Sequence, residues 1–279
     1  MRPMPLPRVI ATDLDGTLLG SNREVSERNR RALCAATEAG IRVVVVTARP
    51  LRATGMIGDA FACAAVSCGN GAYTVIPEEE PLVRAIDVET ASILVKRLRA
   101  CLPDAAFGVE TGTGFYHDTA YRVKPWIPRE WLNDPFDDAA ALPAAASPVV
   151  KLIAQSESAA MHLIHETAVR AVGSLAEVTY SGATGMLELS ASGVTKGSTL
   201  AMLCQRWGVD ADEVVAFGDM PNDSSMLAWA GTGYAMRDGH PDLLDPAQGF
   251  LEAPPSTEDG VARVVEKLLR EEPRVVQSR

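Results

Sequence analysis

The sequence has no long hydrophobic run, although 47% of its 279 residues are hydrophobic. No segment has the apolar length that crosses a bilayer, and the N-terminal segment has no apolar stretch of signal-peptide length. Cysteine is scarce: the five residues are odd in number and include no CxxC pair, which argues against a zinc site. We therefore expect a cytoplasmic protein with reduced thiols and no membrane partner.

The chain also has no excess of positively charged residues. The chain has 26 lysines and arginines against 36 aspartates and glutamates, which gives a formal net charge of −10. This balance argues against nucleic acid as a partner, because nucleic acids bind basic surfaces. It is compatible with a small anionic substrate held at a local basic site. The length allows one and a half or two domains, and the sequence leaves open whether the protein is a monomer or a homodimer.

The chain does contain a pair of aspartates directly after a buried strand. In "VIATDLDGTLLG", residues 9–20, an apolar run ends in Asp13 and Asp15. Side chains two residues apart on a strand point the same way, and two dehydrated carboxylates repel each other. The pattern therefore predicts a positive group beside them, which is a metal ion, a lysine or both. The alternative is that both aspartates are solvated in an Asp-Gly turn.

Apolar segments at both ends of the chain predict an α/β fold with a doubly wound, Rossmann-like parallel sheet. A helix over residues 26–40 separates the first strand from "IRVVVV", residues 41–46, which is apolar on both faces. Such strands belong inside a parallel sheet that helices cover. The pattern resumes with a helix that begins at Lys196 and with the strand "EVVAFGD".

The middle of the chain has a different character. It alternates a helix over residues 88–102 with short strands that look antiparallel, which is typical of an α+β unit. We therefore predict an inserted α+β cap domain over residues 85–185. The core domain would consist of residues 1–84 and 186–279.

Polar residues follow several core strands, at the edge where ligands bind in open α/β sheets. Strand ends of one sheet bring such residues together although they are far apart in the sequence. The residues are Asp13, Asp15, Thr47, Lys196, Asp219, Asn222 and Asp223.

In this order they form four motifs that resemble the haloacid dehalogenase-like hydrolase superfamily. The motifs are Asp13-Leu14-Asp15-Gly16-Thr17, Thr47 at a strand end, Lys196, and Gly218-Asp219-Met220-Pro221-Asn222-Asp223. The long insertion between Thr47 and Lys196, together with "GNGAY", "GDMPNDSSML" and "EDGVA", is similar to the Cof-type branch with a type IIB cap. Two places depart from the family pattern: Ala48, and "AMRDGHP", which puts Arg237 and Asp238 near the site mouth.

The resemblance implies a Mg²⁺-dependent phosphatase. It would hydrolyse small phosphate monoesters, with sugar phosphates as the expected substrates, through an aspartyl-phosphate. Asp13 would be the nucleophile, and Asp15 the general acid and base. Mg²⁺ would be bound by Asp13, the backbone carbonyl of Asp15 and Asp219, with Asp223 as a further ligand or beside the ligands.

The phosphate oxygens would be held by Thr47, Lys196 and Asn222. The cap should select the substrate, and a group of its side chains is chemically able to bind a phosphorylated sugar, although each has an ordinary surface or core role as its alternative. These are Tyr116, His117, Arg122, Lys124 and Trp126, with Lys151 on a cap strand as a further candidate. We expect the other histidines to have no role in the site. His162 and His165 are assigned to a solvated helix face, and His240 is assigned to a loop.

Two other functions stay open at this point. A phosphomutase would use the same residues but protect the phosphoryl group from water. A phospho-ligand-binding module would have lost turnover, which the intact set of acidic residues and Lys196 argues against. A dehalogenase is disfavoured, because its chemistry needs no metal.

Overall fold

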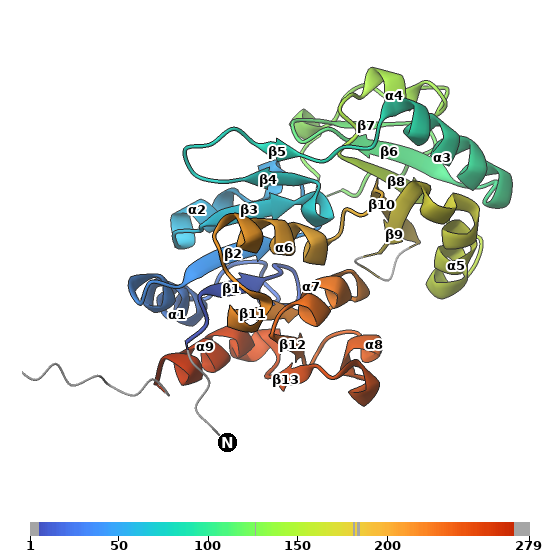
Figure 1. Cartoon of the computed structure of the whole chain (residues 1–279). Coiled ribbons are helices and arrows are strands. Elements are labelled where there is room, and N and C mark those ends of the chain that lie inside the picture. The colour runs from blue at the N-terminus through green and yellow to red at the C-terminus, as the bar shows by residue number, and fades with distance from the viewer. Residues whose placement is uncertain (1–5, 126, 181, 183–184, 271–279) are drawn as a thin grey trace, which may run out of the picture.

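Two β-sheets organise the chain in a computed structural model that describes residues 6–125, 127–180, 182 and 185–270 (Figure 1). The first sheet has the strand order β13-β12-β11-β1-β2-β3-β4-β5. Strands β13 to β3 in this order are parallel, whereas β4 and β5 are antiparallel to their neighbours. The bounds are β1 Val9–Thr12, β2 Arg42–Val46, β3 Ala65–Cys68, β4 Tyr73–Val75, β5 Leu82–Val83, β11 Val214–Gly218, β12 Thr232–Met236 and β13 Leu251–Ala253. The predicted doubly wound α/β fold class is confirmed.

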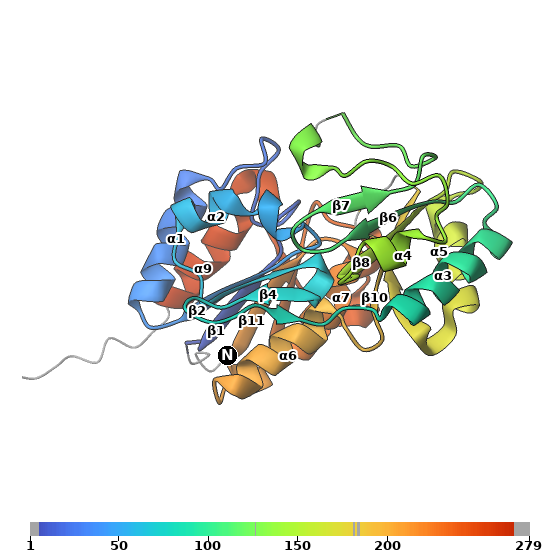
Figure 2. The ribbon, with the colours of Figure 1, turned by 90° about the horizontal axis from the view of Figure 1, so that it is seen from above.

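Helices cover both faces of the first sheet because its central strands are apolar on both sides. Ile10 packs toward α1 and α9, whereas Val9 and Ala11 pack toward α6 and α7. Figure 2 shows α1 and α9 on one side of the sheet and α6 on the other. The bounds are α1 Glu27–Glu38, α2 Gly55–Ala60, α6 Lys196–Arg206, α7 Ser224–Trp229, α8 Pro241–Leu244 and α9 Gly260–Arg270.

Local sequence sets where these helices begin. The Ser26 hydroxyl accepts the backbone N–H of Asn29 at the start of α1, and the Thr195 hydroxyl accepts that of Ser198 at the start of α6. Such caps satisfy backbone donors that have no partner within the helix. Among the described residues, no helix has both the length and the apolar character of a membrane span.

The second sheet has five antiparallel strands in the order β7-β6-β8-β10-β9. Its helices pack on one face, and in Figure 1 the whole unit lies to the upper right of the first sheet. The bounds are β6 Ala106–Glu110, β7 Phe115–His117, β8 Lys151–Gln155, β9 Ala176–Thr179, β10 Met186–Ala191, α3 Val88–Cys101, α4 Leu142–Ala145 and α5 Met161–Val172.

The end of the second sheet differs from the predicted boundary. Residues 186–279 were assigned to the core domain, but β10 pairs with β8 and β9 in the second sheet. The reason is its alternation: Leu187 and Leu189 are buried against the helices of the second sheet, and Glu188 points to the opposite face. Residues 186–191 therefore belong with the inserted strands, while the division into two domains stays a prediction.

Candidate active site

The loops that carry the predicted residues meet at the carboxyl end of the first sheet. Strand β1 lies between β2 and β11, in parallel with both, so Asp13, Thr47 and Asp219 follow three neighbouring strands. The backbone N–H of Asp13 donates to the carbonyl of Phe217 at 3.0 Å, which extends the pairing of β1 with β11.

Lys196, the first residue of α6, brings two carboxylates together. Its Nζ lies 2.9 Å from Asp13 Oδ1 and 2.6 Å from Asp223 Oδ1, and its side chain has no exposed surface. Asp13, Asp219 and Asp223 each offer an oxygen within 4.8 Å of the others. Four predicted residues from three separate parts of the sequence therefore form one buried cluster.

Asp223 also shapes the loop after β11. Its Oδ2 accepts the backbone N–H groups of Asp219 and Met220, both at 3.0 Å, while Oδ1 accepts from Lys196. Both oxygens of this buried carboxylate are thus engaged by protein donors. Its geometry fits the predicted place beside the metal ligands, with a role in holding Asp219.

Asp219 is held from the β1 loop. The Thr17 hydroxyl donates to Asp219 Oδ1 at 2.8 Å. Gly16 has φ +77°, and a Cβ there would collide with the Asp219 carboxylate. The Gly-Thr part of the first motif therefore seats Asp219, a role that the sequence analysis did not assign.

The charges of the cluster do not balance. Burial raises the pKa of the Asp13 carboxyl to about 7, with Lys196 opposing the rise and Asp223 adding to it. Burial and the charges of Asp13 and Asp223 raise the pKa of Asp219 to about 8. Burial alone would lower the pKa of Lys196, but its two carboxylate partners raise it above the usual value. Three carboxylates thus face one ammonium group, and a further cation would stabilise their ionised forms.

The donor set fits Mg²⁺. Asp13 Oδ1 is buried, and apart from its 2.9 Å ion pair with Lys196 it has no hydrogen-bond donor among the described residues. Carboxylate oxygens are the ligands that this hard cation takes in proteins. The Asp15 side chain is not part of the cluster, so the predicted contribution of its backbone carbonyl stays a prediction.

Asp15 is held by an arginine that the sequence analysis did not single out. Arg49 Nε and Nη2 donate to the two carboxylate oxygens of Asp15, each at 2.6 Å. The Asp15 side chain is half exposed, whereas that of Asp13 is almost fully buried. The two aspartates of the first motif therefore occupy different environments, and their roles as nucleophile and acid–base group stay a prediction.

The predicted phosphate-binding residues are placed differently from one another. Thr47 is buried, and its hydroxyl accepts the backbone N–H of Arg49 at 3.2 Å. Asn222 Nδ2 donates to Asn70 Oδ1 at 3.0 Å, and Asn222 Oδ1 is buried without a hydrogen-bond donor among the described residues. Asn70 follows β3 and was not predicted as part of the site.

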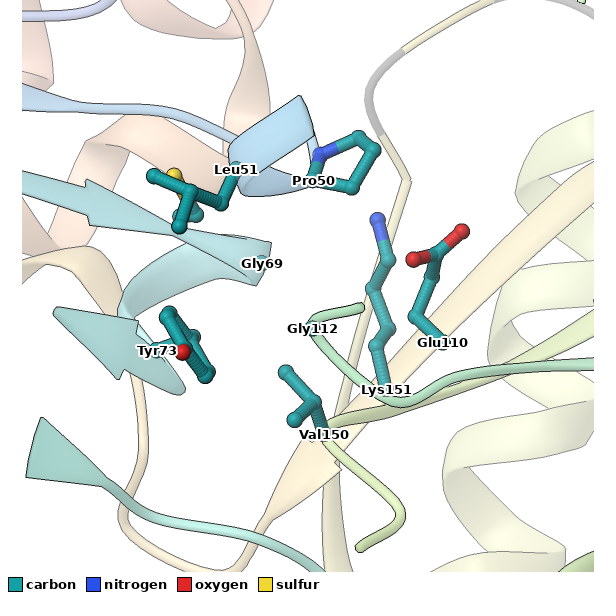
Figure 3. Close-up of a pocket in the computed structure, with 9 residues that line it drawn as sticks. Pro50, Leu51, Gly69, Tyr73, Glu110, Gly112, Val150 and Lys151 are labelled. Atoms are coloured by element: carbon teal, nitrogen blue, oxygen red, sulfur yellow. The ribbon is translucent and has the colours of Figure 1, made fainter. Parts of the chain in front are cut away.

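The second sheet touches the loop after β2. Lys151 Nζ donates to the backbone carbonyl of Ala48 at 2.8 Å and to Glu188 at 2.7 Å. The Arg52 guanidinium pairs with both oxygens of Glu110. Figure 3 shows Glu110 and Lys151 facing Pro50 and Leu51 of this loop across a small cavity.

Three of the other candidates for substrate binding have their observed contacts within the second sheet and its loops. Tyr116 packs toward the helices of the second sheet, and Arg122 pairs with Glu157 at an exposed position. His117 is buried and contacts the carbonyl of its neighbour. Lys124 has a partner of its own, and Trp126 lies outside the described residues.

The remaining histidines partly differ from expectation. His165 contacts the carbonyl of Val178 and the ring of Tyr180, so it is not a freely solvated side chain. His162 is exposed on α5 as expected. His240 precedes α8 and lies edge-on to the Tyr180 ring.

Comparison with known proteins gives matches over nearly the whole chain. A family described as haloacid dehalogenase-like hydrolase matches residues 10–265. The pyridoxal phosphate phosphatase YbhA of Escherichia coli is 28% identical over 92% of this chain and 97% of its own. An HMP-PP phosphatase of Cronobacter sakazakii is 28% identical over 86% of this chain and 87% of its own. The crystal structure of SMU.1108c from Streptococcus mutans superimposes with a TM-score of 0.81 at 25% identity, covering 95% of this chain and 99% of that one.

Proposed function

The chain belongs to the haloacid dehalogenase-like hydrolase family and is a phosphatase, and we propose that it hydrolyses small phosphate monoesters through a Mg²⁺-dependent aspartyl-phosphate. The observation that carries the proposal is the buried cluster of three carboxylates beside Lys196, in which Asp13 Oδ1 has no partner other than that lysine among the described residues. The cluster has both a nucleophile and the oxygens for a hard cation.

In the first step, an oxygen of Asp13 attacks phosphorus, and the bond from phosphorus to the leaving alcohol oxygen breaks. Asp15, in its protonated form, gives its proton to that oxygen. In the structure Arg49 donates to both Asp15 oxygens, so Asp15 must give up one of these two hydrogen bonds when it carries the proton. Bound Mg²⁺ would be held by Asp13 and Asp219 and would supply charge stabilisation to the phosphoryl oxygens.

In the second step, Asp15 takes a proton from water as the water oxygen bonds to phosphorus. The bond between phosphorus and Asp13 breaks, which frees phosphate and restores the carboxylate. Lys196 lies 2.9 Å from Asp13 Oδ1, where it counters negative charge throughout both steps. Thr47 and Asn222 stay our proposal for further phosphate contacts.

We assign the choice of leaving group to the second sheet, which we take as the cap and extend to Ala191. The contacts of Lys151 with Ala48 and of Glu110 with Arg52 support this, because they place cap side chains over the loop that follows Thr47. Sugar phosphates are the class expected from the sequence. The named relatives add phosphorylated heterocycles such as pyridoxal phosphate to the substrates worth testing. The cytoplasmic location stays a prediction.

The test is phosphate release from a panel of sugar phosphates, pyridoxal phosphate and nucleoside monophosphates, with Mg²⁺ and with EDTA. We expect release that requires Mg²⁺. Asp13→Asn should abolish it while the circular dichroism spectrum is kept, and the exposed Asp212→Asn should match the wild type. Release that persists in EDTA or in Asp13→Asn would refute the mechanism. Transfer of phosphate between sugar positions without release would favour a mutase, and binding without turnover a ligand-binding module.

A further inference from the structure

Asn70 occupies a backbone position that favours glycine. It lies between Gly69 and Gly71, and it has φ 58° and ψ 29°, in the left-handed region. Asparagine tolerates this region better than most residues, but glycine adopts it without cost. The side chain is 2% exposed. A buried amide at a position suited to glycine points to a role for the amide itself.

The Asn70 amide connects the site loops to the second sheet. Its Oδ1 accepts from Asn222 Nδ2 at 3.0 Å. Its Nδ2 donates to Glu188 Oε2 at 2.9 Å and to the Thr179 hydroxyl at 3.3 Å, and both of these residues are on strands of the second sheet. The backbone N–H of Asn70 also donates to the carbonyl of Thr47 at 3.0 Å.

Glu188 sets the direction of this chain of hydrogen bonds. Its other oxygen accepts from Lys151 at 2.7 Å, and the pair is nearly fully buried, so both Glu188 oxygens face donors. The Asn70 group facing it must therefore be the NH₂. Its oxygen then faces Asn222, whose NH₂ is directed to Asn70. The orientation of the Asn222 amide, with its oxygen on the other side, thus follows from a cap carboxylate that acts on it through Asn70.

We infer that Asn70 is a positioning residue: contact of the second sheet with Asn70 fixes the orientation of the Asn222 amide. When Glu188 and Thr179 are against Asn70, one orientation of both amides is favoured. When the second sheet moves away, Asn70 loses its acceptor and the Asn222 amide is free to turn. The Asn222 amide therefore keeps its orientation in the site only while the second sheet contacts Asn70. This inference rests on the proposed phosphatase function for its kinetic consequence, but not for the relay between the amides.

Three substitutions test the relay. Asn70→Gly keeps the left-handed backbone and removes only the amide. Asn70→Asp keeps the shape but sets a second carboxylate against Glu188. The double variant Asn70→Asp with Glu188→Gln exchanges donor and acceptor between the two positions and conserves the total charge, so the direction of the chain toward Asn222 is restored. Glu166→Gln, at an exposed position of α5, is the matched control.

The first readout is steady-state kinetics on the best substrate of the panel. We expect Asn70→Gly and Asn70→Asp to lower kcat by about 10- to 100-fold, as misplaced supporting residues do, while KM changes less than about 3-fold. The kcat of the double variant should recover to within about 5-fold of the wild-type value. Two independent losses of packing would not give such a recovery. If Asn70→Gly keeps wild-type kcat, or the double variant is no better than Asn70→Asp, the positioning role is wrong.

The second readout needs no turnover. In protein labelled with ¹⁵N-asparagine, the side-chain NH₂ signals of Asn222, assigned with Asn222→Asp, should move in Glu188→Gln and return in the double variant. Unmoved Asn222 signals in Glu188→Gln would overturn the relay. If the wild type releases no phosphate from any substrate, the proposed function fails, and the NMR result still decides the inference.

Discussion

Replacing Lys196 by methionine would show how much the buried cluster depends on its one cation. The lysine side chain has no exposed surface, and its Nζ lies 2.9 Å from Asp13 Oδ1 and 2.6 Å from Asp223 Oδ1. At an effective dielectric constant of about 20, each contact is worth about 6 kcal/mol of gross attraction. Dehydration of the ammonium group offsets much of this sum, because burial of an ion costs several kcal/mol.

The variant leaves two buried carboxylates without their counter-charge. Removal of one partner from a buried ion pair costs about 3 to 5 kcal/mol. We expect Lys196→Met to lower the free energy of unfolding by this amount at pH 8 in EDTA. Methionine fills a similar volume, so the loss of charge dominates over the loss of packing. The loss should shrink toward pH 5, where protons can take the place of the ammonium group, and also with added Mg²⁺.

Urea unfolding followed by circular dichroism measures this loss. Lys96→Met, at an exposed position of α3, is the control and should change stability by less than about 0.5 kcal/mol. A loss under about 1 kcal/mol for Lys196→Met at pH 8, or a loss that grows toward pH 5, would refute the electrostatic account of the cluster.

Three further outcomes are expected. Gly16→Ala should weaken Mg²⁺ binding, measured by calorimetry, because its Cβ would collide with the Asp219 carboxylate and its positive φ disfavours alanine; unchanged affinity would contradict this. The raised pKa values of Asp13 and Asp219, about 7 and about 8, mean that the folded state keeps protons that the unfolded state releases above about pH 4, so in EDTA stability should fall as pH rises to about 8. Asp219→Asn should flatten this decline in urea titrations, and a decline unchanged in that variant would refute the assignment. Glu110→Gln should alter the ranking of substrates by kcat/KM, because Glu110 pairs with Arg52 across the two sheets, and should leave the Mg²⁺ concentration for half-maximal activity unchanged; the reverse pattern would exclude a cap role.

The core of the site could be predicted from the sequence because most of its residues directly follow the ends of strands. Asp13 and Asp219 follow strongly apolar segments, and parallel pairing of such segments brings their ends together whatever the details of the helices. Lys196 could be placed because it opens a helix at the same edge. Their meeting in space follows from topology, although their chemical roles stay predictions.

The contacts of the second sheet could not be predicted in the same way. Which of its side chains face the first sheet depends on strand register, and a shift of one residue reverses the faces. Tyr116 was proposed as a substrate residue but packs toward the helices, whereas Glu110 and Glu188 face the loops of the site. Asn70 gave a signal in the sequence, the Gly-Asn-Gly turn, but its partners Thr179 and Glu188 depend on the placement of β9 and β10.

The central position of β1 in the first sheet has a consequence for how the protein is made. One neighbour of β1 is the early strand β2, but the other is β11, and Thr17 and Asp219 are 202 residues apart in the chain. During synthesis the whole inserted unit leaves the ribosome before β11 does. Until then β1 is an apolar edge strand with unpaired backbone groups, which is the kind of edge that pairs with other chains. The nascent protein therefore assembles its buried carboxylate cluster and covers the free edge of β1 in the same event.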